Sequence, residues 1–169
     1  FSPVGFTSWE DVARWFHSLW ADRMKPGPQI NALASTITAG VSNDEEKLRR
    51  IFDWVQTNIR YMAVEIGIGG HQPHAAEDIC VNRYGDCKDM TTLLCAFAKA
   101  AGIDLYPAFI SSWFNGTADT SLPSPFHFDH VIAFAPSLGN AGIWMDATDK
   151  GCPFGQLPWY DNGLPVLVV

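Results

Sequence analysis

One cysteine of this chain occupies a position suited to nucleophilic chemistry. Cys87 lies in the segment Arg-Tyr-Gly-Asp-Cys-Lys-Asp (residues 83–89), directly before a run with helical periodicity. A thiol at the start of a helix lies beside unpaired backbone N–H groups and the positive end of the helix dipole, and both favour the thiolate over the thiol. Cysteine catalysis is therefore one interpretation of Cys87. The other is packing, since a free cysteine is commonly a small buried apolar residue.

The helix after Cys87 is predicted from apolar residues that recur with the spacing of one buried stripe: Met90, Leu93, Leu94, Phe97, Ala98 and Ala101. Asp86 is predicted to cap its N-terminus, and Asp89 to reach back toward the free N–H groups. Gly102 is a suitable C-terminal cap. Because Cys87 precedes Met90 by three residues, we expect the thiol on the buried face, at the edge of the core.

A cysteine nucleophile requires a base within hydrogen-bonding reach and a third group that orients the base. The strand-like segment at residues 126–134 contains His127 and His130. His130 alternates with apolar side chains, so it is expected on the core side, against the Cys87 helix, and is the better base. His127 falls on the other face or in the preceding loop. Taken alone, His130 also fits a core histidine.

The next strand-like segment, residues 143–149, carries an acid within an apolar stretch, where Asp146 shares a face with Trp144 and Thr148. A carboxylate in a half-buried strand is costly unless it is paired. A hydrogen bond from His130 to Asp146 would remove this cost, fix the imidazole tautomer and stabilise the imidazolium. The alternative is an aspartate that caps a turn at the strand end, which fits Asp149 better.

The secondary-structure elements that must position these residues are predicted to be mainly helices in the first part of the chain and strands in the later part. Capping-box patterns (Thr7 with Glu10, Ser42 with Glu45) and apolar periodicity predict three helices before residue 59 and a short one at residues 75–81. Strands are expected at residues 59–65, 104–111, 128–135, 143–147 and 164–169, and loops at 67–73 and 113–125. This order predicts an α+β fold with a mainly antiparallel sheet.

Composition narrows the classes of function. The 169 residues carry a net charge of −7 and no basic cluster, which argues against a nucleic-acid partner. The seven Trp residues are expected to fill the core, with a groove for peptide or sugar as the alternative. No apolar run approaches a membrane span. The first residue is Phe, so we expect the chain to be excised from a longer protein, with flanking domains.

Other interpretations of the same residue types stay open at this point. Cys80 and Cys152 are candidates for a disulfide, although their spacing cannot show it. His71 and His74 precede Cys80 and Cys87, and these are zinc-ligand types, but their spacing matches no common zinc pattern. The carboxylates at residues 44–46 fit a helix N-terminus as well as a calcium site.

Three blocks of this sequence together carry a family resemblance. The segment 83–89, Asp129-His130-Val131, and Trp144-Met145-Asp146-Ala147-Thr148 resemble the transglutaminase-like superfamily in type and order. The resemblance extends from about residue 59 to residue 169. It implies a papain-like α+β core, preceded by a helical lead-in at residues 1–58, within a single domain of residues 1–169. The chain looks most like bacterial members that form the central part of larger, often exported proteins, so a periplasmic or secreted location is expected.

The resemblance implies that Cys87 is the nucleophile, His130 the base and Asp146 the orienting acid. The backbone N–H of Cys87 is a natural oxyanion donor. A side-chain donor is expected upstream, and Tyr61 and Gln72 are both candidates. The spacing of Arg83 and Asp89 around Cys87 suggests that these two residues pair and brace the helix start.

The expected reaction is acyl transfer from a peptide or side-chain amide through a thioester on Cys87, with no cofactor or metal. Water as acceptor gives a peptidase or amidase, which we favour because water is always present. An amine acceptor gives a protein-glutamine transglutaminase. The third interpretation is a non-catalytic scaffold or binding module of a larger protein, because fold does not establish function.

Overall fold

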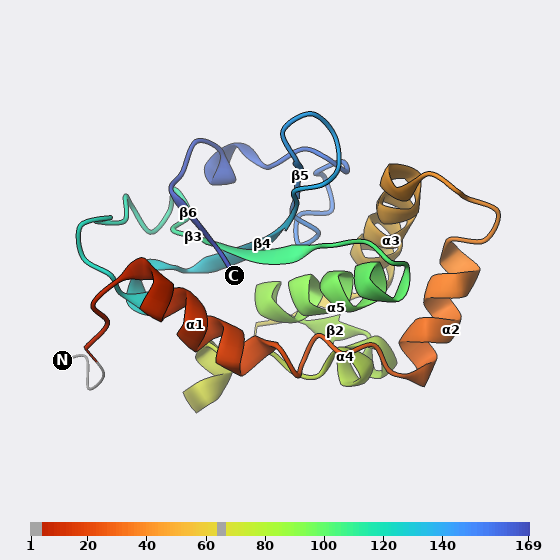
Figure 1. Ribbon diagram of the computed structural model, residues 1–169, viewed down its shortest axis with the longest axis horizontal. Coiled ribbons are helices and arrows are strands. Elements are labelled where there is room, and N and C mark those ends of the chain that lie inside the picture. The colour runs from red at the N-terminus through yellow and green to blue at the C-terminus, as the bar shows by residue number, and fades with distance from the viewer. Residues whose placement is uncertain (1–4, 64–66) are drawn as a thin grey trace.

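The computed structural model describes residues 5–63 and 67–169, and these residues form an α+β fold (Figure 1). The described part has five α-helices: α1 (Trp9–Trp20), α2 (Pro28–Ile37), α3 (Asp44–Asn58), α4 (Ala76–Asn82) and α5 (Cys87–Ala100). Its strands are β1 (Arg60–Tyr61), β2 (Tyr84–Gly85), β3 (Tyr106–Ile110), β4 (His130–Ala135), β5 (Ile143–Met145) and β6 (Val166–Val168). Short 3-10 helices lie at Gly67–Gly70, Pro125–His127 and Trp159–Asp161.

The main sheet has four strands in the order β5-β4-β3-β6, and all neighbours are antiparallel. Phe109 of β3 pairs with Val131 of β4, and Ala133 of β4 pairs with Met145 of β5. β1 and β2 form a separate, parallel two-stranded pair. The expected fold class, helices followed by a mainly antiparallel sheet packed on the Cys87 helix, is confirmed.

Helix α5 lies at the centre of the molecule. It packs on β4 on one side and against α2, α3 and α4 on the others (Figure 1). All residues from Cys87 to Ala98 are buried, including polar ones such as Lys88 and Thr92. The sequence predicted one buried stripe. The structure buries every face because neighbours surround the helix, as is usual for a core helix.

The two faces of the sheet are covered by different parts of the chain. Val131 and Phe109 share one face and pack with Cys87 and α1. Ile132 and Ile110 share the opposite face, and Leu157 and Leu164 of the C-terminal segment pack against it. In Figure 1 this segment lies across the sheet from α5.

The face expected for His130 was therefore wrong. Alternation along β4 places His130 with Ile132 and Phe134, whose neighbours come from the C-terminal segment and not from α5. Both faces of β4 are apolar because both are covered, so an apolar face did not identify the side of the helix. His130 nevertheless reaches the Cys87 helix because it is the first residue of β4, at the end of the strand beside the start of α5.

Several boundaries differ from the expected ones. The capping box of α1 uses Ser8 and Asp11, one residue after the predicted pair. Asn43, and not Ser42, caps α3, and its side chain accepts a hydrogen bond from the backbone N–H of Glu46. The strand expected at residues 59–65 is only Arg60–Tyr61, and residues 64–66 of that segment lie outside the described residues. The expected loop at residues 67–73 contains the 3-10 helix Gly67–Gly70.

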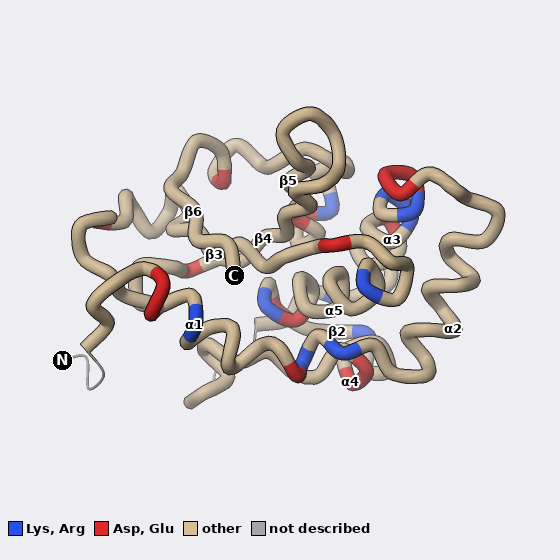
Figure 2. Tube along the Cα trace, viewed as in Figure 1, with Lys and Arg blue, Asp and Glu red and all other residues tan. Residues whose placement is uncertain are grey.

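The acidic residues 44–46 form the first turn of α3, where basic residues accompany them (Figure 2). Asp44 pairs with Lys47, and Glu46 pairs with Arg49 and Arg50. The helix-start interpretation of these carboxylates accounts for all of these contacts. No helix in the described part of the chain is both long enough and apolar enough to span a membrane.

Candidate active site

The start of α5 is built as a capping box. The Asp86 carboxylate accepts hydrogen bonds from the backbone N–H groups of Lys88 and Asp89, at 2.9 and 3.2 Å, and Asp89 accepts one from the backbone N–H of Asp86 at 3.3 Å. Cys87 is the first helical residue and is 4% exposed. Its own backbone N–H has no acceptor among the described residues, as expected at a helix start. The predicted capping residues are confirmed.

Residue 85, two positions before the cysteine, must be a glycine because Asp89 packs closely against it. A Cβ added at Gly85 would collide with the Cβ of Asp89. The tight approach lets Asp89 return to the backbone of Asp86 and complete the cap.

The pairing expected between Arg83 and Asp89 is wrong. Arg83 ends α4 with a left-handed backbone (φ 63°), and its guanidinium lies over the Trp54 ring, 4.6 Å from the centroid. Asp89 instead binds His74, accepting from its backbone N–H at 2.8 Å and contacting Nδ1 at 3.0 Å. The brace at the helix start is thus a histidine from the preceding loop, because the turn after α4 carries Arg83 elsewhere.

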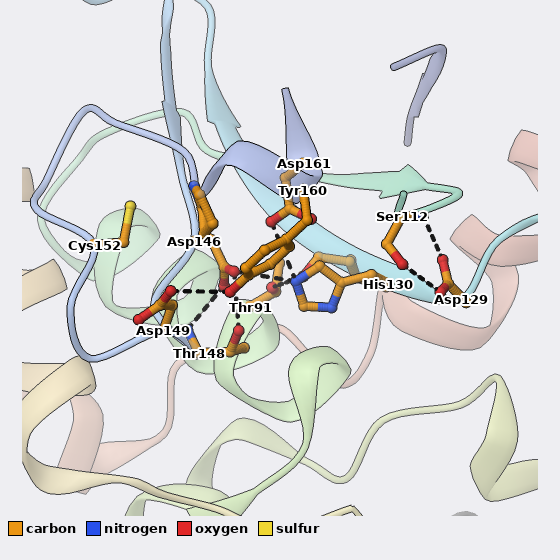
Figure 3. Close-up of polar contacts among 12 residues, drawn as sticks. Thr91, Ser112, Asp129, His130, Asp146, Thr148, Asp149, Cys152, Tyr160 and Asp161 are labelled. Atoms are coloured by element: carbon orange, nitrogen blue, oxygen red, sulfur yellow. Dashed lines mark hydrogen bonds and ion pairs between the residues drawn. The ribbon is translucent and has the colours of Figure 1, made fainter. Parts of the chain in front are cut away.

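The side chains of His130 and Asp146 point toward each other (Figure 3). Nε2 of His130 lies 3.2 Å from Oδ2 of Asp146. Asp146, only 1% exposed, follows β5 and also accepts hydrogen bonds from the backbone N–H and hydroxyl of Thr148, at 2.8 and 2.9 Å. This contact occupies Nε2, so Nδ1 is the ring nitrogen left for Cys87.

Electrostatics keeps this pair charged. Burial lowers the pKa of His130, but hydrogen bonding with Asp146 and with Cys87 outweighs it, so the pKa of His130 lies well above its usual 6.5. Burial raises the pKa of Asp146, but its bonds with His130 and Thr148 outweigh that effect and lower the pKa below its usual 3.8. Both shifts favour an imidazolium–carboxylate pair in the site.

A small cavity of about 80 Å³ joins the thiol and the imidazole. Its walls combine apolar and polar residues: Phe16, Gly70, His71, Cys87, Lys88, Phe109, Phe128, Asp129, His130 and Val131. Three polar members were not predicted as active-site residues: His71, Lys88 and Asp129. Lys88 is buried with its Nζ 2.7 Å from Oδ2 of Asp86, and Asp129 accepts from the N–H and hydroxyl of Ser112.

Neither candidate for a side-chain oxyanion donor is among the described residues that line this cavity. Tyr61 lies in β1 and is exposed. The Gln72 amide points instead to the carbonyl of Leu19, with its nitrogen 3.4 Å from that oxygen. The backbone N–H of Cys87 remains the donor with geometric support.

The remaining cysteines and the residues considered as alternative zinc ligands are dispersed. All four cysteines are free, so the disulfide considered between Cys80 and Cys152 is not present. Cys80 is buried in the helical core, whereas the Cys152 thiol donates to the carbonyl of Gln156 at 3.2 Å. His74 is engaged by Asp89. The four residues considered for zinc therefore do not form a ligand cluster.

The only cluster of three potential metal ligands in the described part of the chain is a different one. It comprises His130, Asp146 and Asp161, whose ligand atoms lie within 4.8 Å of one another. Asp161, from the 3-10 helix Trp159–Asp161, was missed by the sequence analysis. Oδ2 of Asp161 lies 3.8 Å from Nε2 of His130. Nothing in the sequence around Asp161 is periodic or motif-like, and only the packing of the C-terminal segment onto the sheet reveals it.

Comparison with known proteins agrees with this architecture. The family model described as the transglutaminase-like superfamily matches residues 31–108, which include Cys87 but end before His130 and Asp146. Searching the curated proteins gave no match.

The similar solved structures include the following three. A "putative protease" from Parabacteroides distasonis has a TM-score of 0.68 and 17% identity, with 84% of this chain and 27% of that chain covered. A "putative cysteine protease" from Cytophaga hutchinsonii has a TM-score of 0.58 and 20% identity, with 88% and 46% covered. LapG from Legionella pneumophila has a TM-score of 0.50 and 13% identity, with 87% and 76% covered.

The chain therefore has the fold of the transglutaminase-like superfamily. At these identities, the structural likeness concerns the fold. The chain spans less than half the length of the first two structures, with 27% and 46% of them covered.

Proposed function

We propose that this protein catalyses cysteine-dependent acyl transfer from peptide or side-chain amides, with water as the main acceptor. The supporting observation is the position of His130. One side of its ring contacts the buried Asp146 carboxylate, and the ring opens into the same cavity as the Cys87 thiol. A base with a raised pKa, an orienting acid and a nucleophile at a helix start are the parts that such a reaction requires.

In the proposed mechanism, Cys87 reacts as a thiolate whose proton is held on Nδ1 of His130, and this thiolate attacks the amide carbonyl carbon. The backbone N–H of Cys87 donates to the oxyanion that forms. His130 then protonates the leaving amine as the C–N bond breaks, and a thioester remains on Cys87. Water attacks the thioester, His130 takes the proton of the water, and the thiol and a carboxylic acid are released.

The choice of water follows from its availability, since the same residues would serve an amine acceptor. An amine acceptor would make the protein a transglutaminase, and an unreactive Cys87 would favour a binding module. The names of two similar structures, a "putative protease" and a "putative cysteine protease", support the hydrolytic alternative. To separate the acceptors, a glutamine-containing peptide is supplied with and without a primary amine. Faster amine incorporation than ammonia release or peptide cleavage would exclude hydrolysis as the main reaction.

The first test is alkylation of the native protein by iodoacetamide as a function of pH, with each site mapped by mass spectrometry. Burial raises the pKa of Cys80, raises the pKa of Cys152 to about 11 and raises the pKa of Cys95 further. We therefore expect selective modification of Cys87 that persists well below pH 8 and slows at least tenfold in His130→Ala. Slow alkylation of Cys87, unchanged in His130→Ala, would contradict the proposal.

A further inference from the structure

Asp161 is a second carboxylate beside the imidazole, and the mechanism above does not use it. The residue is 3% exposed, and neither carboxylate oxygen accepts a hydrogen bond from a donor in the described residues. Its Oδ2 is 3.8 Å from Nε2 of His130, too far for a hydrogen bond. Figure 3 shows the Asp161 side chain directed from the C-terminal segment toward His130 and Asp146. An ionised carboxylate buried in this way, without a donor, is costly.

Protonation of Asp161 would resolve this cost. A carboxylate offers about four lone-pair sites. Asp146 uses three of these sites, for Nε2 of His130 and for the backbone N–H and hydroxyl of Thr148. One acceptor site on Asp146 remains, and the carboxylate oxygens of Asp161 and Asp146 approach each other within 4.8 Å.

We propose that Asp161 is a positioning residue that, in its protonated form, donates a hydrogen bond to Asp146 and thereby holds Asp146 against Nε2 of His130. The residue touches no substrate and acts through Asp146. This inference rests on the proposed function, because orientation of His130 matters only if His130 is the base for Cys87. In this proposal, titration of Asp161 near neutral pH would change the orientation of His130.

The charges around Asp161 agree with a proton on this group. Burial raises the pKa of Asp161 to about 7 although the positive charge of His130 opposes this shift, and the negative charges of Asp146 and Asp129 also raise it. Tyr160 and Cys152 also lie near enough to feel the Asp161 charge. Asp149, the other neighbouring acid, is held by the Tyr160 hydroxyl at 2.9 Å. Among the main contributions to its pKa from the described residues, His130 is the one positive charge.

Ionisation of Asp161 should change the site in a defined way. The donor to Asp146 is lost, and a second negative charge appears 3.8 Å from Nε2 of His130. Two neighbouring carboxylates then repel each other, and the imidazole is no longer held by one acceptor. We therefore expect reactivity that depends on His130 to have an inflection near pH 7 that comes from Asp161.

The first experiment observes the proton directly and does not need catalysis. In protein labelled with ¹³C at the aspartate side chains, one carboxyl resonance should titrate near pH 7 and disappear in Asp161→Asn. It should remain in Asp104→Asn, a control that removes one exposed acid outside the site. Absence of any aspartate that titrates between about pH 6 and pH 8 would overturn the proposal.

The second experiment measures the rate of Cys87 alkylation against pH in three variants. Asp161→Asn keeps a donor but cannot ionise, so it should keep the parent rate at pH 6 and lose the inflection near pH 7. Asp161→Ala removes the donor and should be slower at every pH, by about tenfold. Equal slowing of both variants, or an unchanged inflection in Asp161→Asn, would overturn the role of Asp161. If Cys87 alkylation is slow and independent of His130 in the parent, the proposed function fails instead, while the NMR titration still reports on Asp161.

A metal site is the competing use of the same three side chains. His130, Asp146 and Asp161 together would suit a divalent cation with nitrogen and oxygen ligands. Calorimetric titration of the protein with Zn²⁺ at pH 7.5 distinguishes the two. We expect no stoichiometric binding, since Asp146 is already committed to Thr148 and His130. Tight binding of one Zn²⁺ that is lost in Asp161→Asn would overturn the proposal in favour of a metal site.

Discussion

Two histidine–aspartate pairs flank the same helix start, and they differ in their surroundings. Nδ1 of His74 lies 3.0 Å from Asp89, and Nε2 of His130 lies 3.2 Å from Asp146. The aspartates are similarly buried, but the His74 side chain is 66% exposed and the His130 side chain is 14% exposed. Asp89 also caps α5, whereas Asp146 has no helix to cap.

The comparison shows that pair geometry alone does not define a catalytic group. The His74–Asp89 pair faces solvent, where an ion pair contributes little and a histidine has no reaction partner. The His130–Asp146 pair is withdrawn from water, and its imidazole shares a cavity with a thiol. We infer that the first pair braces the loop that carries Cys87 and that the second performs proton transfer.

The largest expected difference between the pairs is in the rate of amide hydrolysis. His130→Ala should lower kcat/KM by about 10³-fold, because general acid–base catalysis is lost. The matched variant His74→Ala should change it by less than about threefold, since the backbone N–H of His74 still binds Asp89. Steady-state kinetics on a peptide amide checks both values. Similar losses in the two variants would remove the distinction drawn here.

The aspartates provide a second test, in which activity and stability separate. Asp146→Asn should lower kcat/KM by about 10²- to 10⁴-fold with little effect on folding, because an amide stabilises the imidazolium poorly and favours the wrong tautomer. Asp89→Asn should instead lower the free energy of unfolding by roughly 1–2 kcal/mol through the weakened cap. Kinetics and urea denaturation of both variants are the measurements. If only Asp146→Asn caused a large loss of stability, Asp146 and not Asp89 would be the structural aspartate.

The brace also depends on the absence of a side chain at residue 85. Gly85→Ala should lower the free energy of unfolding by about 1–3 kcal/mol, because the new Cβ displaces Asp89 from the capping box. Gly70→Ala is the control, since a Cβ there meets nothing and the backbone is not left-handed. Urea denaturation at neutral pH should show no more than about 0.5 kcal/mol of change for this control. Equal effects would mean that the close approach at Gly85 is easily relieved.

The remaining expected effect is a pH dependence of stability. Asp161 has a pKa of about 7 in the folded protein, against 3.8 for an ordinary aspartate. The folded state therefore binds this proton more tightly, so the contribution of Asp161 to the free energy of unfolding is full below pH 4 and is lost as pH rises from about 4 to 7. Relative to Asp161→Asn, the parent should lose up to about 4 kcal/mol over this range, because each pKa unit corresponds to about 1.4 kcal/mol. Parallel stability curves from urea titrations would contradict the raised pKa.

The sequence predicted elements with strong local signals better than the contacts between them. The helix from Cys87, its capping residues and the strands that carry His130 and Asp146 were all identifiable, because periodicity and caps involve residues a few positions apart. Arg83 was assigned a wrong partner, because the direction of a side chain after a turn depends on backbone dihedrals that spacing does not reveal. That residues 1–169 form one domain stays a prediction, and a single cooperative unfolding transition would support it.

What the sequence by itself determined is the order of the chemical groups and the helix that presents the thiol. The tertiary structure alone decided which sheet face His130 occupies, that Asp89 binds His74, and that Asp161 reaches the imidazole across 31 residues of chain. The physical reason is the range of the interactions. Caps and amphipathic patterns are local, whereas a buried acid acquires its partners only when distant segments pack together and exclude water.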